Sequence, residues 1–190
     1  ALAQQNAELL ASILLVQPVR PGLPVLYCGR LSMMEPRTGL STWSGVELGL
    51  ASAATVQIGH RYGLPVNVYG LSTNAHTLEI QSGYERALNA AIPALAGADE
   101  LSGIGEMEAG VMGSYAQMVC DDEIALSVRR LRRGFAADED ALAVDVIAEV
   151  MDGSRNFLDQ RHTVRYLRAG EVQYTRLAER RSWGEWDRTG

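Results

Sequence analysis

Leu64-Pro65-Val66-Asn67-Val68-Tyr69-Gly70-Leu71-Ser72-Thr73-Asn74-Ala75-His76 is the stretch that decides the fold of this chain. Its apolar centre, Val66–Tyr69, lies between a proline and a glycine and predicts a short buried strand. The polar residues that follow predict a loop, and a helix is expected to begin near Thr77. In parallel α/β folds, ligands bind where such loops leave the carboxyl ends of the strands. Ser72–His76 is therefore the first candidate for function.

The same pattern occurs earlier in the chain. Gly22-Leu23-Pro24-Val25 leads to Gly29 as Gly63-Leu64-Pro65-Val66 leads to Gly70, and the two copies are 41 residues apart. A weaker third copy runs over residues 98–105. Strands that recur every roughly thirty to forty residues, with helical patterns between them, indicate βα units of a parallel sheet. The alternative is a chance similarity of the two Leu-Pro-Val strings.

Hydrophobic periodicity predicts the other elements. Thr77 is expected to cap the helix after the central strand, and Pro93 to kink or end it. Ser114 forms a capping box with Gln117, and Asp138 caps a later helix. The expected helices are 6–16, 44–62, 79–96, 114–133 and 138–151, and the expected strands are 25–28, 66–69 and 101–104.

Composition excludes several classes of protein. With 190 residues, 47% of them hydrophobic, the chain can bury a core and is not disordered. A net charge of −6 argues against nucleic acid as the main partner. No apolar run reaches membrane-spanning length. Two cysteines, Cys28 and Cys120, argue against a disulfide framework and favour a reducing, cytoplasmic location.

The chain contains no lysine, so all 17 basic residues are arginines. Arginine stays protonated and forms no Schiff base, so lysine-dependent aldolase chemistry, lysine-linked pyridoxal phosphate and a P-loop are excluded within this chain. The chain also begins without methionine, which suggests a fragment, a processed product or a shortened form of a longer protein.

The distribution of charge indicates two parts. Residues 121–190 hold 26 of the 40 charged side chains. We expect a partial β/α barrel of about three units over residues 1–135, and a helical C-terminal extension and arm over 136–190. Three parallel strands cannot close a barrel, which needs about 250 residues. The sheet is either part of a larger barrel or a small open sheet covered by helices. The arm would pack on a partner subunit or on a missing domain, so a homo-oligomer is expected.

Several short motifs together resemble the trimethylamine methyltransferase family. They cover nearly the whole chain and match the carboxyl-terminal part of the family's barrel. The matching residues are Gln81-x-Gly83-Tyr84-Glu85, Gly103-x-Gly105, Glu108-x-Gly110, Ser114-Tyr115-x-Gln117, Asp121-Asp122-Glu123-Ile124, Arg129-Arg130-Leu131, His162-Thr163 and Arg181-Ser182-x-x-Glu185-Trp186.

The resemblance implies a TIM-barrel enzyme that moves a methyl group from a methylated amine to the cobalt of a corrinoid. The corrinoid would be carried by a separate partner protein and not held tightly by this chain. Archaeal members carry pyrrolysine in a loop after one barrel strand, and the alignment puts Ser72 there. Serine forms no imine-type adduct, so the chain looks more like the non-pyrrolysine branch, which includes demethylases of glycine betaine and related quaternary amines.

A quaternary ammonium group has no N–H, so its site must recognise a diffuse cation through aromatic faces and a carboxylate. Glu108 is the first candidate for the catalytic carboxylate, and Glu106 is the second. Ser72 is the other catalytic candidate. The expected substrate-binding residues are Thr73, Asn74, His76, Tyr69, Glu106 and Tyr115. Each has a structural alternative: a capping or charge-neutralising carboxylate, ordinary turn chemistry, a solvated loop histidine or a core tyrosine.

Other polar clusters have simpler interpretations. Cys28, Cys120 and the histidines lack zinc-ligand spacing, so no metal site is expected. The acidic run Asp121-Asp122-Glu123 is expected to be solvated or to pair with Arg129 and Arg130. The basic run 129–133 either is a solvated helix end or contacts a corrinoid protein.

Two other functions stay open. One is a non-catalytic half-barrel that binds a partner or dimerises. The other is an unrelated small α/β enzyme with an open sheet.

Overall fold

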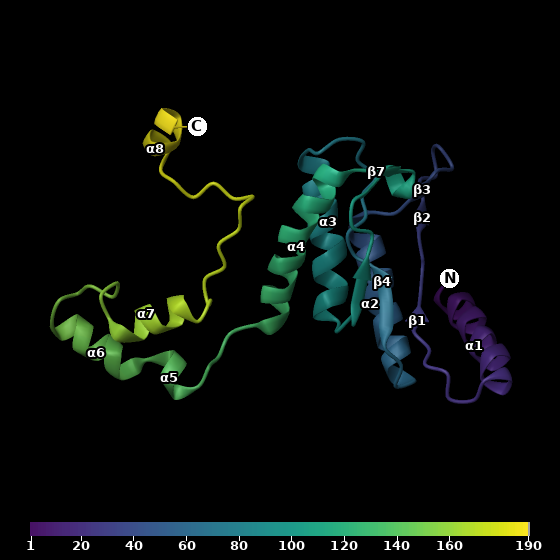
Figure 1. The fold of residues 1–190 in the computed structure, drawn as a ribbon, viewed down its shortest axis with the longest axis horizontal. Coiled ribbons are helices and arrows are strands. Elements are labelled where there is room, and N and C mark those ends of the chain that lie inside the picture. The colour runs from purple at the N-terminus through teal and green to yellow at the C-terminus, as the bar shows by residue number, and fades with distance from the viewer. Residues whose placement is uncertain (190) are drawn as a thin grey trace. The chain divides into compact units, whose positions relative to one another are not determined.

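The computed structural model describes residues 1–189 (Figure 1). The chain divides into two compact units, Ala1–Arg132 and Arg133–Gly190. The first unit contains a three-stranded parallel sheet and the long helices, and the second contains only helices and connecting segments. None of the described helices combines the length and the apolar character needed to cross a membrane.

The sheet of the first unit has the order β1-β4-β5, with β1 over Tyr27–Cys28, β4 over Val66–Tyr69 and β5 over Glu100–Ser102. Both pairings are parallel, with Tyr27 opposite Val66 and Val68 opposite Leu101. The predicted parallel βα organisation is confirmed. The described sheet is open, so a closed eight-stranded barrel stays a prediction.

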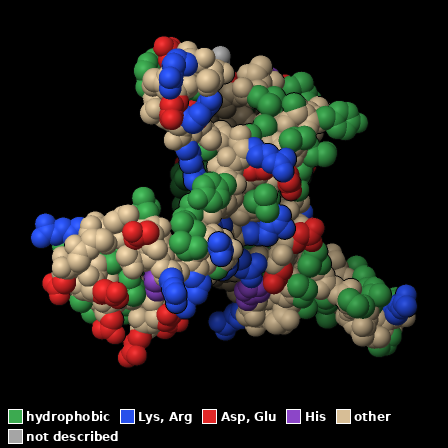
Figure 2. Space-filling model, turned by 60° about the vertical axis from the view of Figure 1, so that its left-hand side comes forward, with side chains coloured by type: hydrophobic (Ala, Val, Ile, Leu, Met, Phe, Trp, Pro, Cys, Tyr) green, Lys and Arg blue, Asp and Glu red, His purple; other side chains and the backbone are tan. Residues whose placement is uncertain are grey.

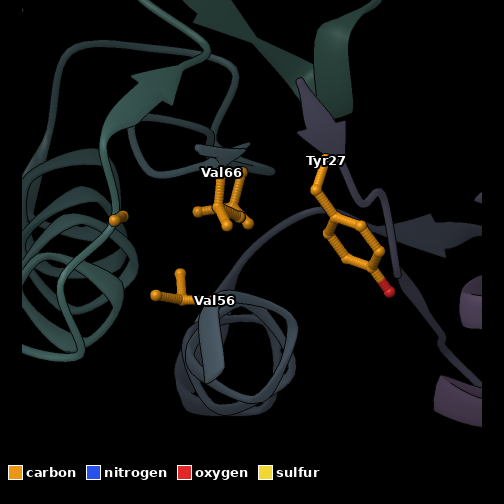
Figure 3. Packing of buried hydrophobic residues seen from close by; sticks show 5 residues of the cluster. Tyr27, Val56 and Val66 are labelled. Carbon is orange, nitrogen blue, oxygen red and sulfur yellow. The ribbon is translucent and has the colours of Figure 1, made fainter. Parts of the chain in front are cut away.

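Four long helices belong to this unit: α1 (Leu2–Val19), α2 (Gly45–Arg61), α3 (Ile80–Leu95) and α4 (Tyr115–Arg133). α2 and α3 pack against each other and against β4. Because side chains alternate along a strand, Val66 and Val68 of β4 point to the α2 side. There they form a buried cluster with Tyr27, Val56 and Ala98. Figure 3 shows Val66 and Tyr27 pointing toward the helix that carries Val56.

Small residues let α2 approach the sheet closely. A Cβ atom at Gly59 would lie 2.4 Å from Cγ2 of Val66 and 2.9 Å from Cδ1 of Tyr27, so no larger residue fits there without movement. The same holds at Gly49, also in α2, where a Cβ would lie 2.7 Å from Cδ1 of Ile92 in α3. The small-residue composition of this helix therefore has a packing reason.

Two short hairpins lie in the loops after the parallel strands. β2 (Met33–Met34) pairs with β3 (Ser41–Thr42) between β1 and α2. β6 (Glu106–Met107) pairs with β7 (Met112–Gly113) between β5 and α4. The 3-10 turn η1 (Glu108–Gly110) joins β6 to β7.

The ends of the helices agree in part with the predictions. The Gln117 N–H donates to Ser114 Oγ at 3.2 Å, so the predicted Ser114 cap of α4 is confirmed. The reciprocal half of the capping box is wrong, because the Gln117 side chain bonds Ser82 and Asp121 and the Ser114 N–H donates to Gly105 O. The expected cap by Thr77 is wrong, because α3 begins at Ile80 and Glu79 is its N-cap residue. Pro93 stays inside α3, two residues before the end of the helix.

The second unit contains α5 (Glu139–Leu142), α6 (Val144–Asp152), α7 (Arg161–Arg168) and α8 (Trp183–Thr189). The Ala141 N–H donates to Asp138 Oδ1 at 2.8 Å, which confirms the predicted cap. A single helix over 138–151 is wrong, because Ala143 takes a left-handed conformation (φ 51°) that separates α5 from α6.

Hydrophobic side chains reach the surface in several places (Figure 2). Leu14, Leu15 and Val19 of α1 are among the most exposed, and so are Tyr115 and Val119 of α4. Apolar surface on several helices at once is typical of a protein whose faces are covered by further protein.

Candidate functional site

The loops after β4 and β5 are joined by backbone hydrogen bonds. The Glu108 N–H donates to Ala75 O at 3.0 Å. The Ala109 N–H donates to Thr73 O at 2.8 Å. The segments 71–76 and 103–113, which we call the rim loops, therefore lie side by side at the carboxyl ends of the parallel strands.

Glu108 lies in a strained part of the second rim loop. Its φ is 49° and that of Ala109 is 55°, a region that non-glycine residues rarely adopt and that costs about 1–3 kcal/mol per residue. Glu108 Oε1 lies 3.5 Å from Nε2 of His76, on the other rim loop. The His76 side chain is 71% exposed. Such strain persists only where neighbours hold the backbone, and it is enriched at functional sites.

Glu106 is a half-buried carboxylate on the second rim loop. Burial raises the pKa of its side chain above the ordinary value, while the positive charges of Arg86 and Arg30 oppose that rise. Glu106 also lines a hollow of about 280 Å³ together with Tyr115 and Met118. A half-buried carboxylate at the edge of a hollow is a candidate for binding a cation, because water screens it poorly.

Arg30 crosses the face of the sheet that the helices leave uncovered. That face carries Asn67, Tyr69 and Ser102, since Val66 and Val68 point the other way. The Arg30 guanidinium donates to the backbone and side-chain oxygens of Asn67, and to Ser102 Oγ at 3.2 Å. Its central carbon lies 4.6 Å from the centroid of the Tyr69 ring. Arg30 thereby joins β1 to β4 and β5 on this face.

Trp43 adds a second aromatic ring beside Tyr69. The two ring centroids are 4.8 Å apart in an edge-to-face arrangement. Asn74 holds this segment in place, because its Oδ1 accepts from the Trp43 N–H at 2.8 Å and its Nδ2 donates to Ser41 O at 3.2 Å. The loop after β1 is thus attached to the first rim loop.

Ser72 and Thr73 lie beneath the surface. Both side chains are 0% exposed. Thr73 Oγ1 donates to Glu85 Oε2 at 2.6 Å, and the Ala75 N–H donates to Thr73 Oγ1 at 3.0 Å. Within residues 1–189, Ser72 Oγ has no hydrogen-bond partner, although Ser72 O accepts from Asn89 Nδ2 at 3.0 Å. In this conformation neither hydroxyl can touch a molecule at the surface.

The structure brings most of the predicted site residues to one region. Glu108 and His76 lie together, Glu106 and Tyr115 share a hollow, and Asn74 contacts the segment that carries the partner ring of Tyr69. Ser72 and Thr73 lie in the same loop but are buried. A catalytic or substrate-binding role for any of these residues stays a prediction.

Sequence reasoning missed four residues of this region. Arg30 follows Gly29 in the first copy of the repeated unit, as Leu71 follows Gly70 in the second copy. The repeat therefore indicated that position 30 begins a loop after a strand. Trp43 carries no comparable signal. Glu85 and Arg86 are charged residues on the buried side of α3, where apolar residues are expected. The expectation that Asp121 is solvated or pairs with Arg129 and Arg130 is wrong, because Asp121 is fully buried and pairs with Arg86 at 2.8 Å.

Metal-binding groups do not gather in the described part of the chain. No group of three or more His, Cys, Asp or Glu side chains within residues 1–189 has a geometry that could hold a metal ion. Cys28 and Cys120 are both free thiols.

Comparison with known proteins agrees with these motifs. The family model described as trimethylamine methyltransferase (MTTB) matches residues 1–190. Trimethylamine methyltransferase MttB of Methanosarcina thermophila is 33% identical over 189 residues, which are 100% of this chain and 38% of that protein. Glycine betaine methyltransferase of Desulfitobacterium hafniense (strain Y51) is 33% identical over 186 residues, 97% of this chain and 38% of that protein.

The chain thus spans 38% of the length of each of these curated relatives. Because the family model covers all of it, the chain belongs to the trimethylamine methyltransferase family.

Proposed function

We propose, from this membership, that the chain forms part of a methyltransferase that moves a methyl group from a methylated amine to the Co(I) of a corrinoid carried by a separate protein. The amine is proposed to be quaternary, of the glycine betaine kind. The observation that carries the proposal is the pairing of the rim loops at the carboxyl ends of the strands. Glu108 lies at this pairing and Glu106 precedes it on the same loop, while Arg30 lies over Tyr69 at the end of β4.

The chemistry of this edge suits a methylated ammonium ion. The positive charge of such an ion is spread over its methyl groups, so it is attracted by carboxylates and aromatic faces without a hydrogen bond. Glu106 supplies the half-buried carboxylate, and burial strengthens its attraction for a cation because less water screens it. Glu108 supplies a second negative charge, which His76 tempers when it is protonated.

Arg30 distinguishes a betaine from a simple amine in this proposal. Its guanidinium lies over Tyr69 on the uncovered face of the sheet, and its positive charge opposes the rise that burial causes in the pKa of Glu106. The terminal nitrogens of Arg30 already donate to Gly29 O, to Asn67 and to Ser102 Oγ, so in this conformation Arg30 attracts a substrate carboxylate through its charge. A substrate with a carboxylate at one end and a methylated ammonium at the other could therefore contact Arg30 with the first and Glu106 with the second.

The transfer itself requires alignment more than proton chemistry. The methyl carbon carries no acidic proton, so no general base is needed. The amine leaves with the electron pair of the broken C–N bond, and the corrinoid, as the second substrate, supplies the pair for the new bond. The chain's own residues would hold the ammonium group in line and exclude water.

The proposal is tested in the full-length protein with the corrinoid on its carrier protein. Methylation of Co(I) is followed spectroscopically with glycine betaine and with trimethylamine as donors. We expect Glu106→Gln and Glu108→Gln each to lower the rate by at least about tenfold, since each removes a charge aimed at the cation. Glu100→Gln is the matched control, because Glu100 is an exposed carboxylate at the other end of β5.

Failure of the wild-type protein to methylate Co(I) with either donor contradicts the proposed reaction. Full activity of both Glu106→Gln and Glu108→Gln contradicts the assigned site. The open edges of the sheet favour a second candidate, a non-catalytic half-barrel that binds a partner. An inactive full-length protein that still forms a stable complex with another subunit would support it.

A further inference from the structure

Glu85 and Arg86 are adjacent charged residues on α3 that are both buried. Arg86 is 0% exposed and Glu85 is 7% exposed. Burying a charge costs free energy unless hydrogen bonds and opposite charges compensate it. The partners of these two side chains are therefore informative, and they lie on the rim loops.

Arg86 binds both rim loops at once. Its guanidinium donates to Leu71 O in the first loop and to Glu106 O in the second. A longer contact of 3.5 Å reaches Gly103 O, also in the second loop. One rigid, planar group thus holds carbonyl oxygens from two loops in a fixed relation to each other.

Asp121 of α4 completes the arrangement. Its Oδ2 accepts from Arg86 at 2.8 Å and from the Gly105 N–H at 2.7 Å. Its Oδ1 accepts from Gln117 Nε2 at 2.8 Å, and Gln117 Oε1 accepts from Ser82 Oγ at 3.1 Å. The hydrogen bonds run without interruption from α3 through the second rim loop to α4.

Glu85 holds the first rim loop from its other side. Its Oε2 accepts from Thr73 Oγ1 at 2.6 Å and from the Asn74 N–H at 2.8 Å. Its Oε1 accepts from Gln81 Nε2 at 3.0 Å. The two neighbouring residues of α3 therefore hold different parts of the same loop with opposite charges.

We infer that Glu85 and Arg86, with Asp121, are positioning residues that fix the rim loops relative to each other and thereby place the carboxylates of Glu106 and Glu108. Their effect on methyl transfer rests on the proposed function, whereas their effect on the loops does not. None of the three touches the surface where a substrate would bind. A lysine at position 86 keeps the charge but lacks the planar fork, so it cannot satisfy acceptors on both loops together.

The first test is amide hydrogen exchange in the full-length protein. Arg86→Lys should raise the exchange rates of the Glu108 and Ala109 amides at least about tenfold, because these amides bond across the rim loops. Arg132→Lys is the matched control: Arg132 donates to Ala98 O at 3.0 Å, near the amino end of β5. Equal exchange of both amides in wild type and Arg86→Lys overturns the inference.

Two milder variants keep the test valid if Arg86→Lys does not fold. Glu85→Gln and Asp121→Asn each preserve the shape of the side chain and remove its charge. Each should raise the exchange of the same two amides while the Val68 amide, in β4, exchanges as in wild type. Unchanged exchange at Glu108 and Ala109 in both variants overturns the inference as well.

A kinetic readout separates positioning from general stabilisation. In an active enzyme, Glu85→Gln and Asp121→Asn should lower kcat at least about tenfold with little change in KM, because the substrate still binds but is misaligned. Gly59→Ala, in the core between α2 and β4, should leave kcat unchanged even where it lowers the melting temperature. A wild-type protein without methyl transfer refutes the proposed function alone, since hydrogen exchange still decides the positioning role. Unchanged kcat in both variants, with wild-type activity intact, overturns that role.

Discussion

The two carboxylates of the rim loops, Glu106 and Glu108, have different surroundings. Glu106 is a half-buried carboxylic acid whose pKa is raised by burial, and only the positive charges of Arg86 and Arg30 limit that rise. The Glu108 side chain is 41% exposed and lies beside His76. Ionising the Glu106 carboxylate is unfavourable because burial removes part of its hydration. A cation in the neighbouring hollow would compensate for that loss, so this carboxylate is suited to binding one.

The raised pKa of Glu106 predicts a stability effect with a defined sign. The folded chain binds a proton at Glu106 more tightly than the unfolded chain does, so wild type loses stability as the pH rises from about 4.3 through the folded pKa. Glu106→Gln lacks this titration, so it should melt at a higher temperature than wild type at pH 7. The gain in the free energy of unfolding should be less than about 1 kcal/mol, because water partly screens the group.

The measurement is thermal unfolding of the full-length protein and of Glu106→Gln at pH 4 and pH 7. The difference between the two melting temperatures should be smaller at pH 4 than at pH 7, because the Glu106 side chain is mostly protonated there. A variant less stable than wild type at pH 7 would mean that the ionised carboxylate stabilises the fold, contrary to this prediction.

Ser72 gives a second prediction at this scale. Its hydroxyl is fully buried and has no hydrogen-bond partner, so Ser72→Ala removes an unsatisfied polar group and should leave stability unchanged or raise it by about 1 kcal/mol. Its burial also predicts methyl transfer within about twofold of wild type. A large loss of activity without a loss of stability would instead support the catalytic role first expected for Ser72.

At the scale of elements, the sequence predicted what depends on local pattern. β4 has the predicted bounds, and the caps of α4 and α5 are formed by the predicted residues, Ser114 and Asp138. The predictions failed where tertiary contacts decide. Asp121 is bound by a buried arginine from another helix, and Ala143 breaks a helix that periodicity alone would continue. The contacts of Arg30 and Arg86 form only where the carboxyl ends of the strands meet. Those strands are far apart in the sequence, so no short stretch of sequence reveals these contacts.

The close contact between α2 and the sheet is testable by substitution. Gly59→Ala should destabilise the fold by about 1–3 kcal/mol, because its Cβ would lie 2.4 Å from Cγ2 of Val66 in the core. Gly83→Ala in α3 is the control, since nothing lies within 4 Å of its added Cβ. That variant should be stabilised by about 0.5–1 kcal/mol. Urea unfolding measures both, and the same sign of effect for the two variants would contradict the packing described here.

At the scale of the whole molecule, the described sheet is open on both sides. β1 and β5 each pair with β4 alone in this sheet, and a hollow of about 430 Å³ beside β1 is lined by Gln5, Cys28 and Arg30. Gln5 Oε1 is buried and has no hydrogen-bond partner among the described residues 1–189. An unpaired strand edge next to an unsatisfied acceptor suits a further strand. The chain spans 38% of the length of its relatives, so such strands fit the larger barrel that the resemblance implies.

The most direct measurement is the binding of glycine betaine to the full-length protein by isothermal titration calorimetry, compared with 3,3-dimethylbutanoate. The two molecules have the same shape and the same carboxylate, but the second has carbon in place of the charged nitrogen. We expect wild type to bind glycine betaine at least about tenfold more tightly and Glu106→Gln to lose most of this preference. Equal affinity of wild type for both molecules would contradict the claim that the rim loops form a site for a methylated ammonium ion.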